Sequence, residues 1–196
     1  MFETIKPLVL ASASPRRNRF FAELGLEFSS CPAELDESLF PDEKPSDYVK
    51  RITRAKARQV AGQFSSSWVV SADTIVVLDD TVLGKPADIE EALTLLMLLS
   101  GKIHRVTTAY CLMNLDKDIC EIESVSTLVR FTSFDEKLAR AYACTGEPLD
   151  KAGAYGIQGK GGLLVASIEG SYTNVVGLPL TEVISLLLRY NIIAVK

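Results

Sequence analysis

Short apolar runs alternate with amphipathic helix patterns along most of this chain, and this alternation restricts the folds available to it. Runs of strand length cover 8–11 and 68–72, and longer β-rich segments cover 105–113 and 119–131. The polar residues 114–118 join the two longer segments into a hairpin. Strands that alternate with helices around a central hairpin predict an α/β fold, with a mixed sheet and flanking helices.

Local end signals place the first helix and the strand that carries the first candidate carboxylate. Ser14 as N-cap and Pro15 at the first helical position begin a helix that Gly25 ends. The run from Trp68 is expected to end as a buried strand at Asp73, with extended chain beyond it.

Three further helices are predicted from apolar spacing and capping pairs. A long amphipathic helix starts at Ser46, and its expected apolar side is Tyr48, Val49, Ile52, Ala55 and Val60. Capping pairs at Asp88 with Glu91 and at Ser133 with Glu136 open the next two.

The length of 196 residues fits a single domain, 1–196, which could form two lobes around a central cleft. A hydrophobic fraction of 47% with 23% charged residues is typical of a soluble globular protein. The net charge of −4 argues against nucleic-acid binding, which needs a basic surface, but it leaves room for a small anionic ligand.

Cysteine and histidine usage narrows the chemistry further. The four cysteines contain no CxxC pair, which favours free thiols in a reducing compartment. His104 is the one histidine, so a site with two histidines is excluded, and no nucleophile-elbow motif supports a Ser-His-Asp triad. Residues 1–7 resemble no secretory signal, and the longest apolar stretch, 95–99, is too short to span a bilayer. We therefore expect a cytoplasmic protein that does not enter a membrane.

Polar residues at the ends of predicted elements are the first candidates for a site. Ser14, Arg16 and Arg17 lie at a helix start, where N–H groups and guanidinium groups favour phosphate. Asp73 could act as a metal ligand or a general base. Their structural alternatives are a plain helix cap with solvated arginines and a turn-forming carboxylate.

Three more residues come from a helix and two loops. Lys56 on the long helix and Lys85 before Pro86 could hold phosphates, although solvated lysines are the simpler interpretation of each. Gln158 lies in the glycine-dense stretch 153–162 and offers a donor and an acceptor suited to a base edge. An irregular surface loop is its structural alternative.

Together these motifs resemble the Maf family of nucleotide pyrophosphatases over about 8–190. The matching segments, in order, are Leu10-Ala11-Ser12-Ala13-Ser14-Pro15-Arg16-Arg17, Leu35-Asp36-Glu37, Arg54-Ala55-Lys56-Ala57, Ala72-Asp73-Thr74, Gly84-Lys85-Pro86, Leu99-Ser100-Gly101, the 147–162 loop, Glu169-Gly170-Ser171-Tyr172 and Val176-Gly177-Leu178-Pro179-Leu180.

The resemblance implies a two-lobed fold similar to inosine triphosphate pyrophosphatase and hydrolysis between the α- and β-phosphates with a divalent cation. Asp73 matches the family's proton acceptor, and Arg17, Thr74 and Gln158 match positions that set substrate choice. The pattern resembles the branch acting on dTTP and UTP rather than the branch acting on 7-methyl-GTP. A homodimer is implied by the resemblance alone.

These residues suggest a mechanism. Asp73 would be the base or a metal ligand, and Glu37 the second carboxylate for Mg²⁺ or Mn²⁺. Ser14, Arg16 and Arg17 would hold the triphosphate, with Lys56 and Lys85 completing a positive wall. This requires Asp73 to lie near the first helix.

Thr74 and Gln158 could pair with the O4 and N3–H edge of uracil or thymine, so CTP is expected to be a poor substrate. Two other functions stay open: a 7-methyl-GTP pyrophosphatase, and a nucleotide-binding regulator of cell division that inhibits septum formation.

Overall fold

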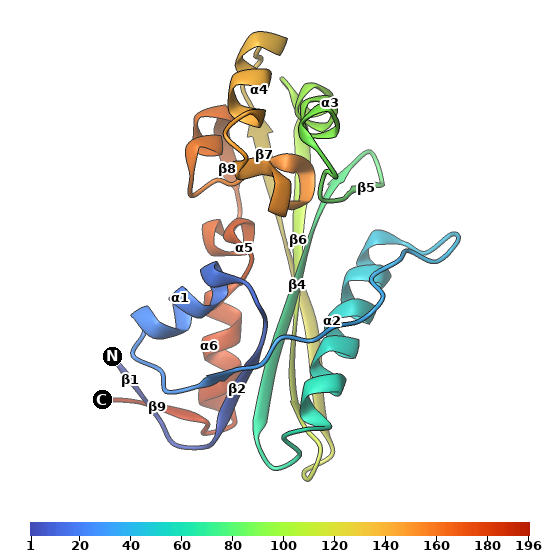
Figure 1. The fold of residues 1–196 in the computed structure, drawn as a ribbon. Helices are drawn as coiled ribbons and strands as arrows, with labels where there is room; N and C mark the ends of the chain where they lie inside the picture. Colours follow the sequence, from blue (N-terminus) through green and yellow to red (C-terminus); the bar gives the residue numbers. More distant parts are fainter. The chain divides into compact units, whose positions relative to one another are not determined.

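The structure is a computed structural model that describes all 196 residues, and it has α/β architecture with a mixed sheet and flanking helices (Figure 1). The strands are β1 (Phe2–Thr4), β2 (Leu8–Ala11), β3 (Ser29–Ser30), β4 (Trp68–Leu78), β5 (Thr81–Leu83), β6 (Ile103–Asn114), β7 (Ile119–Phe131), β8 (Val165–Glu169) and β9 (Ile193–Val195). The α-helices are α1 (Pro15–Glu23), α2 (Pro45–Ala61), α3 (Ile89–Leu99), α4 (Glu136–Ala143), α5 (Tyr172–Val176) and α6 (Leu180–Arg189). Three short 3-10 helices follow α4: η1 (Glu147–Asp150), η2 (Ala152–Ala154) and η3 (Lys160–Leu164). None of the helices is both long and apolar enough to cross a membrane.

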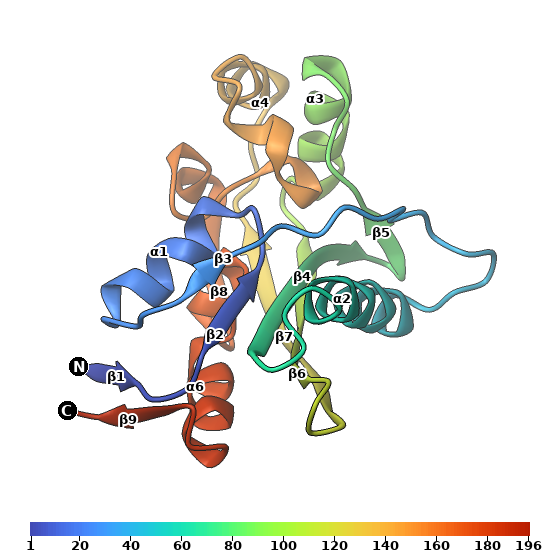
Figure 2. The ribbon, with the colours of Figure 1, turned by 60° about the horizontal axis from the view of Figure 1, so that its bottom comes forward.

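The larger sheet has the strand order β3-β2-β4-β6-β7-β8, and β5 pairs with β4 outside this path. β2 is parallel to both β3 and β4, whereas β4 with β5 and β7 with β8 are antiparallel. A separate antiparallel pair, β1 with β9, brings the two ends of the chain together (Figure 2).

The chain divides into two compact units. Unit 1 comprises Met1–Asp73, Thr108–Ser124 and Gly177–Lys196, and unit 2 comprises Thr74–Thr107 and Val125–Val176. Three of the four boundaries between the units fall inside β4, β6 and β7, and the fourth follows Val176 at the end of α5.

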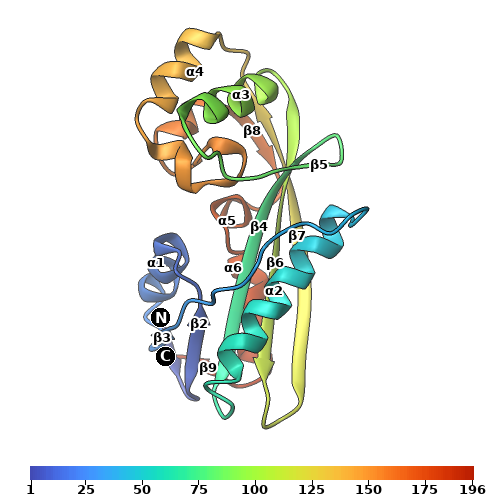
Figure 3. The same cartoon turned by 45° about the vertical axis from the view of Figure 1, so that its right-hand side comes forward.

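In unit 1, helices cover both faces of the parallel strands, with α2 on one face and α6 on the other (Figure 3). Successive strand residues point to opposite faces. On β4, Val69 packs in a core cluster with Ala57 and Val60 of α2, whereas the Trp68 ring lies 5.1 Å from the ring of Tyr190 at the end of α6. The buried side of α2 includes Ala57 rather than the expected Ala55, which is half-buried.

In unit 2, α3 and α4 lie side by side (Figure 1), and a buried core joins them to the ends of the long strands. This core includes Val76, Leu96, Phe131, Tyr142 and Tyr155. The glycine-dense stretch 153–162, predicted as a loop, contains no α-helix or strand and consists of the end of η2, a turn and the start of η3.

Of the two predicted capping pairs, one is confirmed and one is wrong. The Asp88 side chain accepts from Glu91 N at 2.8 Å and opens α3, as predicted. The pair of Ser133 and Glu136 is wrong as a capping box, because Asp135 is the N-cap of α4 and accepts from Leu138 N at 2.9 Å. A carboxylate one residue before the helix reaches the free N–H groups that Ser133 is too early to meet.

Candidate functional site

The turn from β2 into α1 begins the site. Ser14 occupies the N-cap position with extended φ/ψ, but its side chain makes no capping hydrogen bond, contrary to the expected role. The Ser14 N–H donates to Ser12 Oγ at 3.1 Å, and Arg17 Nη1 donates to the same oxygen at 3.4 Å. Ser12 therefore organises this turn, a role that the sequence did not single out, and the Ser14 hydroxyl is not committed to capping.

Arg17 is half-buried, and its Nε donates to the Gly177 carbonyl at 2.7 Å. Burial lowers the Arg17 pKa, and the neighbouring charge of Arg16 lowers it further, while Asp73 and Glu37 act in the opposite direction. The guanidinium thus lies within the field of both carboxylates. Asp73 interacts electrostatically with Arg17 of the first helix, in agreement with the prediction that the two lie near each other.

Asp73 lies inside β4 rather than at its end, which corrects the expected strand boundary. Ser71, two residues earlier on the same face, donates from its Oγ to the Thr53 carbonyl of α2 at 2.8 Å. Because side chains alternate along a strand, this contact also directs Asp73 toward α2. Asp73 and Thr74 are half-buried in a strand whose other residues are all buried.

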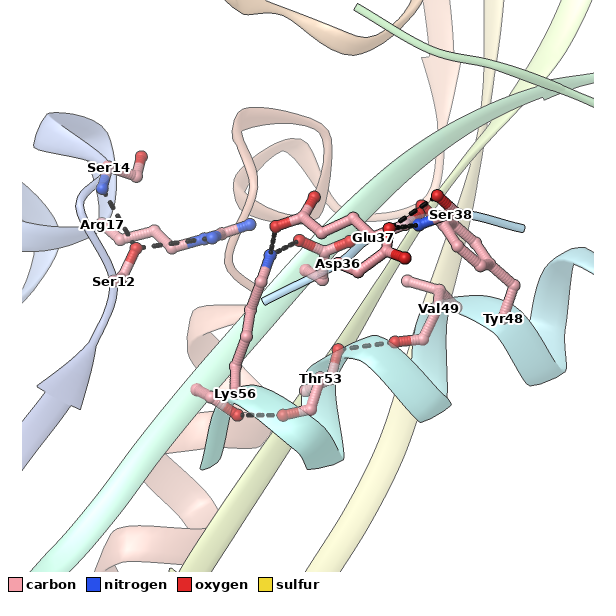
Figure 4. A network of polar contacts seen from close by, with 12 residues as sticks. Ser12, Ser14, Arg17, Asp36, Glu37, Ser38, Tyr48, Val49, Thr53 and Lys56 are labelled. Carbon is pink, nitrogen blue, oxygen red and sulfur yellow. Dashed lines mark hydrogen bonds and ion pairs between the residues drawn. The ribbon is translucent and has the colours of Figure 1, made fainter. Parts of the chain in front are cut away.

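Lys56 of α2 joins two carboxylates. Its Nζ lies 2.5 Å from Asp73 Oδ1 and 2.7 Å from Glu37 Oε1 (Figure 4). The side chains of Lys56 and Asp73 are 12% and 14% exposed, so water screens this pair weakly, whereas Glu37 is 45% exposed. The Arg17 side chain points toward this group in Figure 4.

Glu37 lies in the 32–44 segment, which α2 anchors through two residues that the sequence did not single out for this role. Tyr48 Oη donates to the Glu37 carbonyl at 2.8 Å. Arg51 binds both carboxylate oxygens of Glu43 at 2.6 and 2.7 Å and donates to the Ser38 carbonyl at 2.9 Å. Their spacing on one face of a helix was the available signal, but it does not reveal the partner segment.

The strand order explains why these residues meet. β3 lies on one side of β2 and β4 on the other. The connection from β2 to β3 through α1 therefore crosses the sheet in one direction, and the connection from β3 to β4 through α2 crosses it in the opposite direction. With right-handed crossovers, α1 and α2 then lie on opposite faces of the sheet. Ligands of α/β proteins bind at the carboxyl ends of strands where the strand order reverses in this way.

Thr74, Lys85 and Gln158 belong to unit 2. Lys85 and Gln158 are exposed, and Thr74 is half-buried. The Gly84 carbonyl beside Lys85 accepts from Gly153 N at 3.0 Å, which ties the Lys85 loop to the segment that leads to Gln158.

His104 and the cysteines take no part in this group. The His104 ring is buried, with Nε2 2.8 Å from Tyr155 Oη, and burial lowers its pKa to about 4. All four cysteines are free thiols, as predicted. A hydrolytic triad through His104 is therefore not supported.

The donor set of unit 1 fits a divalent cation that needs few protein ligands. No three His, Cys, Asp or Glu side chains converge on a metal-binding position. The Asp73 and Glu37 carboxylates do converge on one ammonium group, so a cation in its neighbourhood would meet two hard oxygen ligands. Mg²⁺ is commonly held by one or two carboxylates together with water and substrate phosphates.

Comparison with known proteins covers almost the whole chain. Residues 7–190 match the family model described as Maf-like protein. A dTTP/UTP pyrophosphatase of Desulfotalea psychrophila is 50% identical over 195 residues, with 100% of both chains covered. Proteins of the same name from Syntrophomonas wolfei and Nitratidesulfovibrio vulgaris are 48% and 47% identical, covering 92% and 96% of this chain and 95% and 90% of theirs.

Among solved structures, a nucleoside-triphosphatase (dITP/XTP pyrophosphatase) of Mycobacterium abscessus aligns with a TM-score of 0.48 at 13% identity, covering 94% of this chain and 96% of its own. The match to the family model and the identity to these relatives, both over more than nine tenths of the sequence, establish that this chain belongs to the Maf-like protein family.

Proposed function

We propose that this protein is a nucleoside triphosphate pyrophosphatase that hydrolyses dTTP and UTP to the monophosphate and pyrophosphate. The carrying observation is the Asp73 carboxylate, held 2.5 Å from Lys56 Nζ and within the field of Arg17. A carboxylate beside two cationic groups supplies the base and the phosphate contacts that such hydrolysis needs. Relatives that are 42–50% identical are named dTTP/UTP pyrophosphatase, and this supports dTTP and UTP as the substrates.

Attack at the α-phosphorus needs a positioned water, a group that accepts its proton, and cations that stabilise the charge developing on the phosphate oxygens. Asp73 acts as the base, directly or as a ligand to the divalent cation, and the Lys56 ammonium lies beside its carboxylate. Ser14, Arg16 and Arg17 bind phosphate oxygens at the start of α1, where N–H groups already favour an anion. Lys85 adds a further positive charge.

Asp73 and Glu37 would hold the divalent cation, Mg²⁺ or Mn²⁺, and it would supply positive charge against the phosphate oxygens. The Lys56 ammonium lies beside both carboxylates and would contact the phosphates that this cation binds.

Thr74 and Gln158 read the base. A hydroxyl and an amide can satisfy the O4 and N3–H edge of uracil or thymine, whereas cytosine presents a donor at N4 where the site expects an acceptor. CTP is therefore a poor substrate in this proposal, and turnover of CTP equal to that of UTP contradicts it.

The test is a pyrophosphate-release assay over dTTP, UTP, CTP and 7-methyl-GTP, with and without Mg²⁺ or Mn²⁺. Asp73→Asn should reduce turnover by about 10²–10⁴-fold, the usual contribution of a general base. Asp116→Asn, in the exposed β6–β7 turn of the same unit, is the matched control and should keep wild-type activity.

Other outcomes distinguish the alternatives. A preference for 7-methyl-GTP would identify the other branch of the family. Nucleotide binding without turnover, or a cell-division phenotype that survives Asp73→Asn, would favour a regulator of septum formation.

Two properties complete the proposal. We place the enzyme in the cytoplasm, where its four free thiols stay reduced, and a homodimer is the state that the family resemblance implies. Cell fractionation and analytical ultracentrifugation test these two assignments.

A further inference from the structure

The turn that carries Gln158 is built around one carboxylate, that of Glu147. Glu147 Oε2 accepts from Lys160 N at 2.9 Å, and Oε1 accepts from Gly161 N at 3.1 Å. Both donors lie just after Gln158 and Gly159 in the chain. The carboxylate therefore fixes the exit of the turn through two backbone bonds.

Tyr142 of α4 fixes the entry of the same turn. Its hydroxyl donates to Glu147 Oε1 at 2.9 Å and accepts from Gly156 N at 3.1 Å. Between entry and exit, Gly159 N donates to the Gly156 carbonyl at 3.2 Å and closes a tight turn with Gln158 inside it. One hydroxyl and one carboxylate thus bind backbone N–H groups at the start and at the end of the 156–161 turn, whose Gln158 side chain is exposed.

The glycines of the turn make room for these two groups. A Cβ on Gly159 would lie 2.5 Å from Glu147 Cδ, far inside van der Waals contact. Gly159 has φ −102° and ψ −151°, an extended conformation that alanine also adopts, so space rather than backbone freedom requires glycine there. A Cβ on Gly161 would likewise overlap the Tyr142 hydroxyl.

The charge states suit these roles. Burial favours the neutral form of Glu147, but the N–H groups of Lys160 and Gly161 and the Tyr142 hydroxyl outweigh it and hold the Glu147 pKa below its ordinary value. Burial raises the pKa of Tyr142. At neutral pH the carboxylate accepts and the phenol donates, as the hydrogen bonds require.

We propose that Glu147 and Tyr142 are positioning residues for base recognition: they hold the 156–161 turn in the one conformation that presents the Gln158 amide to the pyrimidine. This inference rests on the proposed function, because it assigns base reading to Gln158. Neither residue needs to touch the nucleotide. Their effect is on the choice of base rather than on the chemical step.

The first experiment separates positioning from catalysis. Glu147→Gln and Tyr142→Phe should raise KM for UTP and lower the ratio of kcat/KM for UTP to that for CTP about tenfold or more, with kcat changed far less. Glu136→Gln, which removes an exposed carboxylate of α4 in the same unit, is the control and should leave the ratio unchanged. An unchanged ratio in both variants would overturn the proposal, and so would a loss confined to kcat.

The second experiment reads the turn without any activity. Trypsin cleavage after the exposed Lys160, followed by intact-mass spectrometry, should be faster in Glu147→Gln and Tyr142→Phe than in wild type and the control. Glu147→Gln weakens the acceptor of the 160 and 161 amides, and Tyr142→Phe removes the acceptor of the Gly156 amide. In a double-mutant cycle, Gly159→Ala should be harmful in the wild type and nearly neutral beside Glu147→Ala, since the added methyl then meets no carboxylate. Equal cleavage rates with an additive cycle would overturn the positioning role.

These readouts separate the two proposals. Absence of pyrophosphate release from the wild type with both dTTP and UTP refutes the proposed function, whatever the trypsin result. The inference alone is refuted if the wild type releases pyrophosphate while Glu147→Gln keeps both the wild-type trypsin cleavage rate and the wild-type preference for UTP over CTP.

Discussion

Lys56 carries the positive charge between two carboxylates, and this makes it the most informative single position after Asp73. Its Nζ lies within 2.7 Å of an oxygen of both Asp73 and Glu37, with little exposure to water. Without the ammonium, the two carboxylates lose the cation that they share. In the proposed mechanism, the substrate phosphates also lose one positively charged contact. The mutual repulsion of the two carboxylates would also move them apart.

We expect Lys56→Met to lower kcat/KM for UTP about 10–100-fold, the equivalent of one charge-assisted hydrogen bond, and Asp73→Asn to be worse. Lys50→Met is the matched control, since Lys50 lies on the same helix in a long, partly exposed ion pair with Glu123 at 3.8 Å. Steady-state kinetics over a UTP series provides the measurement. Equal losses in the two lysine variants would exclude a special role for Lys56.

His104 predicts how stability depends on pH. Burial lowers its pKa in the folded protein to about 4, against an ordinary value of 6.5. The unfolded chain therefore binds a proton that the folded chain refuses, and the free energy of unfolding falls as pH drops from about 6.5 to about 4. The full difference corresponds to roughly 3 kcal/mol.

His104→Phe should remove this contribution, so that the loss of stability between pH 7 and pH 4.5 becomes smaller by about 2 kcal/mol. Urea unfolding at the two pH values measures it. The comparison uses the difference in unfolding free energy between the two pH values, because the variant also removes the hydrogen-bond partner of the Tyr155 hydroxyl at every pH. An unchanged difference would mean that His104 is not the group that titrates.

At the scale of elements, the sequence pattern and the structure assign the N-cap of α4 to different residues. Asp135 accepts from Leu138 N and caps the helix, whereas the sequence pattern favoured Ser133. Asp135→Ala should lower the free energy of unfolding by about 1 kcal/mol, and Ser133→Ala should change it by less than about 0.5 kcal/mol. Urea denaturation of both variants decides between the two caps, and the reverse order would restore the sequence prediction.

β4 shows why element ends are hard to locate from sequence. The run Trp68–Ala72 is apolar, and Asp73 interrupts it, so a strand boundary was expected there. β4 instead runs to Leu78, because backbone pairing does not depend on side-chain polarity and the interrupting carboxylate is neutralised by Lys56. A polar residue inside a strand is tolerated when a partner of opposite charge meets it.

At the scale of the whole molecule, substrate binding should stabilise the folded chain by mass action. A ligand at 100 times its Kd contributes about 2.7 kcal/mol when it binds the native state alone. A non-hydrolysable α,β-methylene analogue of UTP with Mg²⁺ should therefore raise Tm by a few degrees, and the CTP analogue should raise it far less. Differential scanning fluorimetry checks this, and equal shifts would argue against base reading by Gln158.

Local patterns were enough to predict the α/β class, the ends of α1 and α3, the free cysteines and the family. Periodicity and capping act over a few residues, so one chain is enough to detect them. The sequence also supplied the candidate residues of the site, because their types suit nucleotide chemistry. It misplaced the end of β4 and the cap of α4.

Which of these residues meet follows from the packing of the fold and not from local patterns. Lys56 contacts both Glu37 and Asp73 because β4 lies beside β2 and α2 packs on the face of β4 that carries Asp73. This arrangement depends on the strand order, which local sequence patterns do not reveal. Tyr142 and Glu147 surround the Gln158 turn because α4 packs beside the 3-10 helices. Side-chain convergence depends on the packing of distant segments, and for that reason the polar network emerged only with the fold.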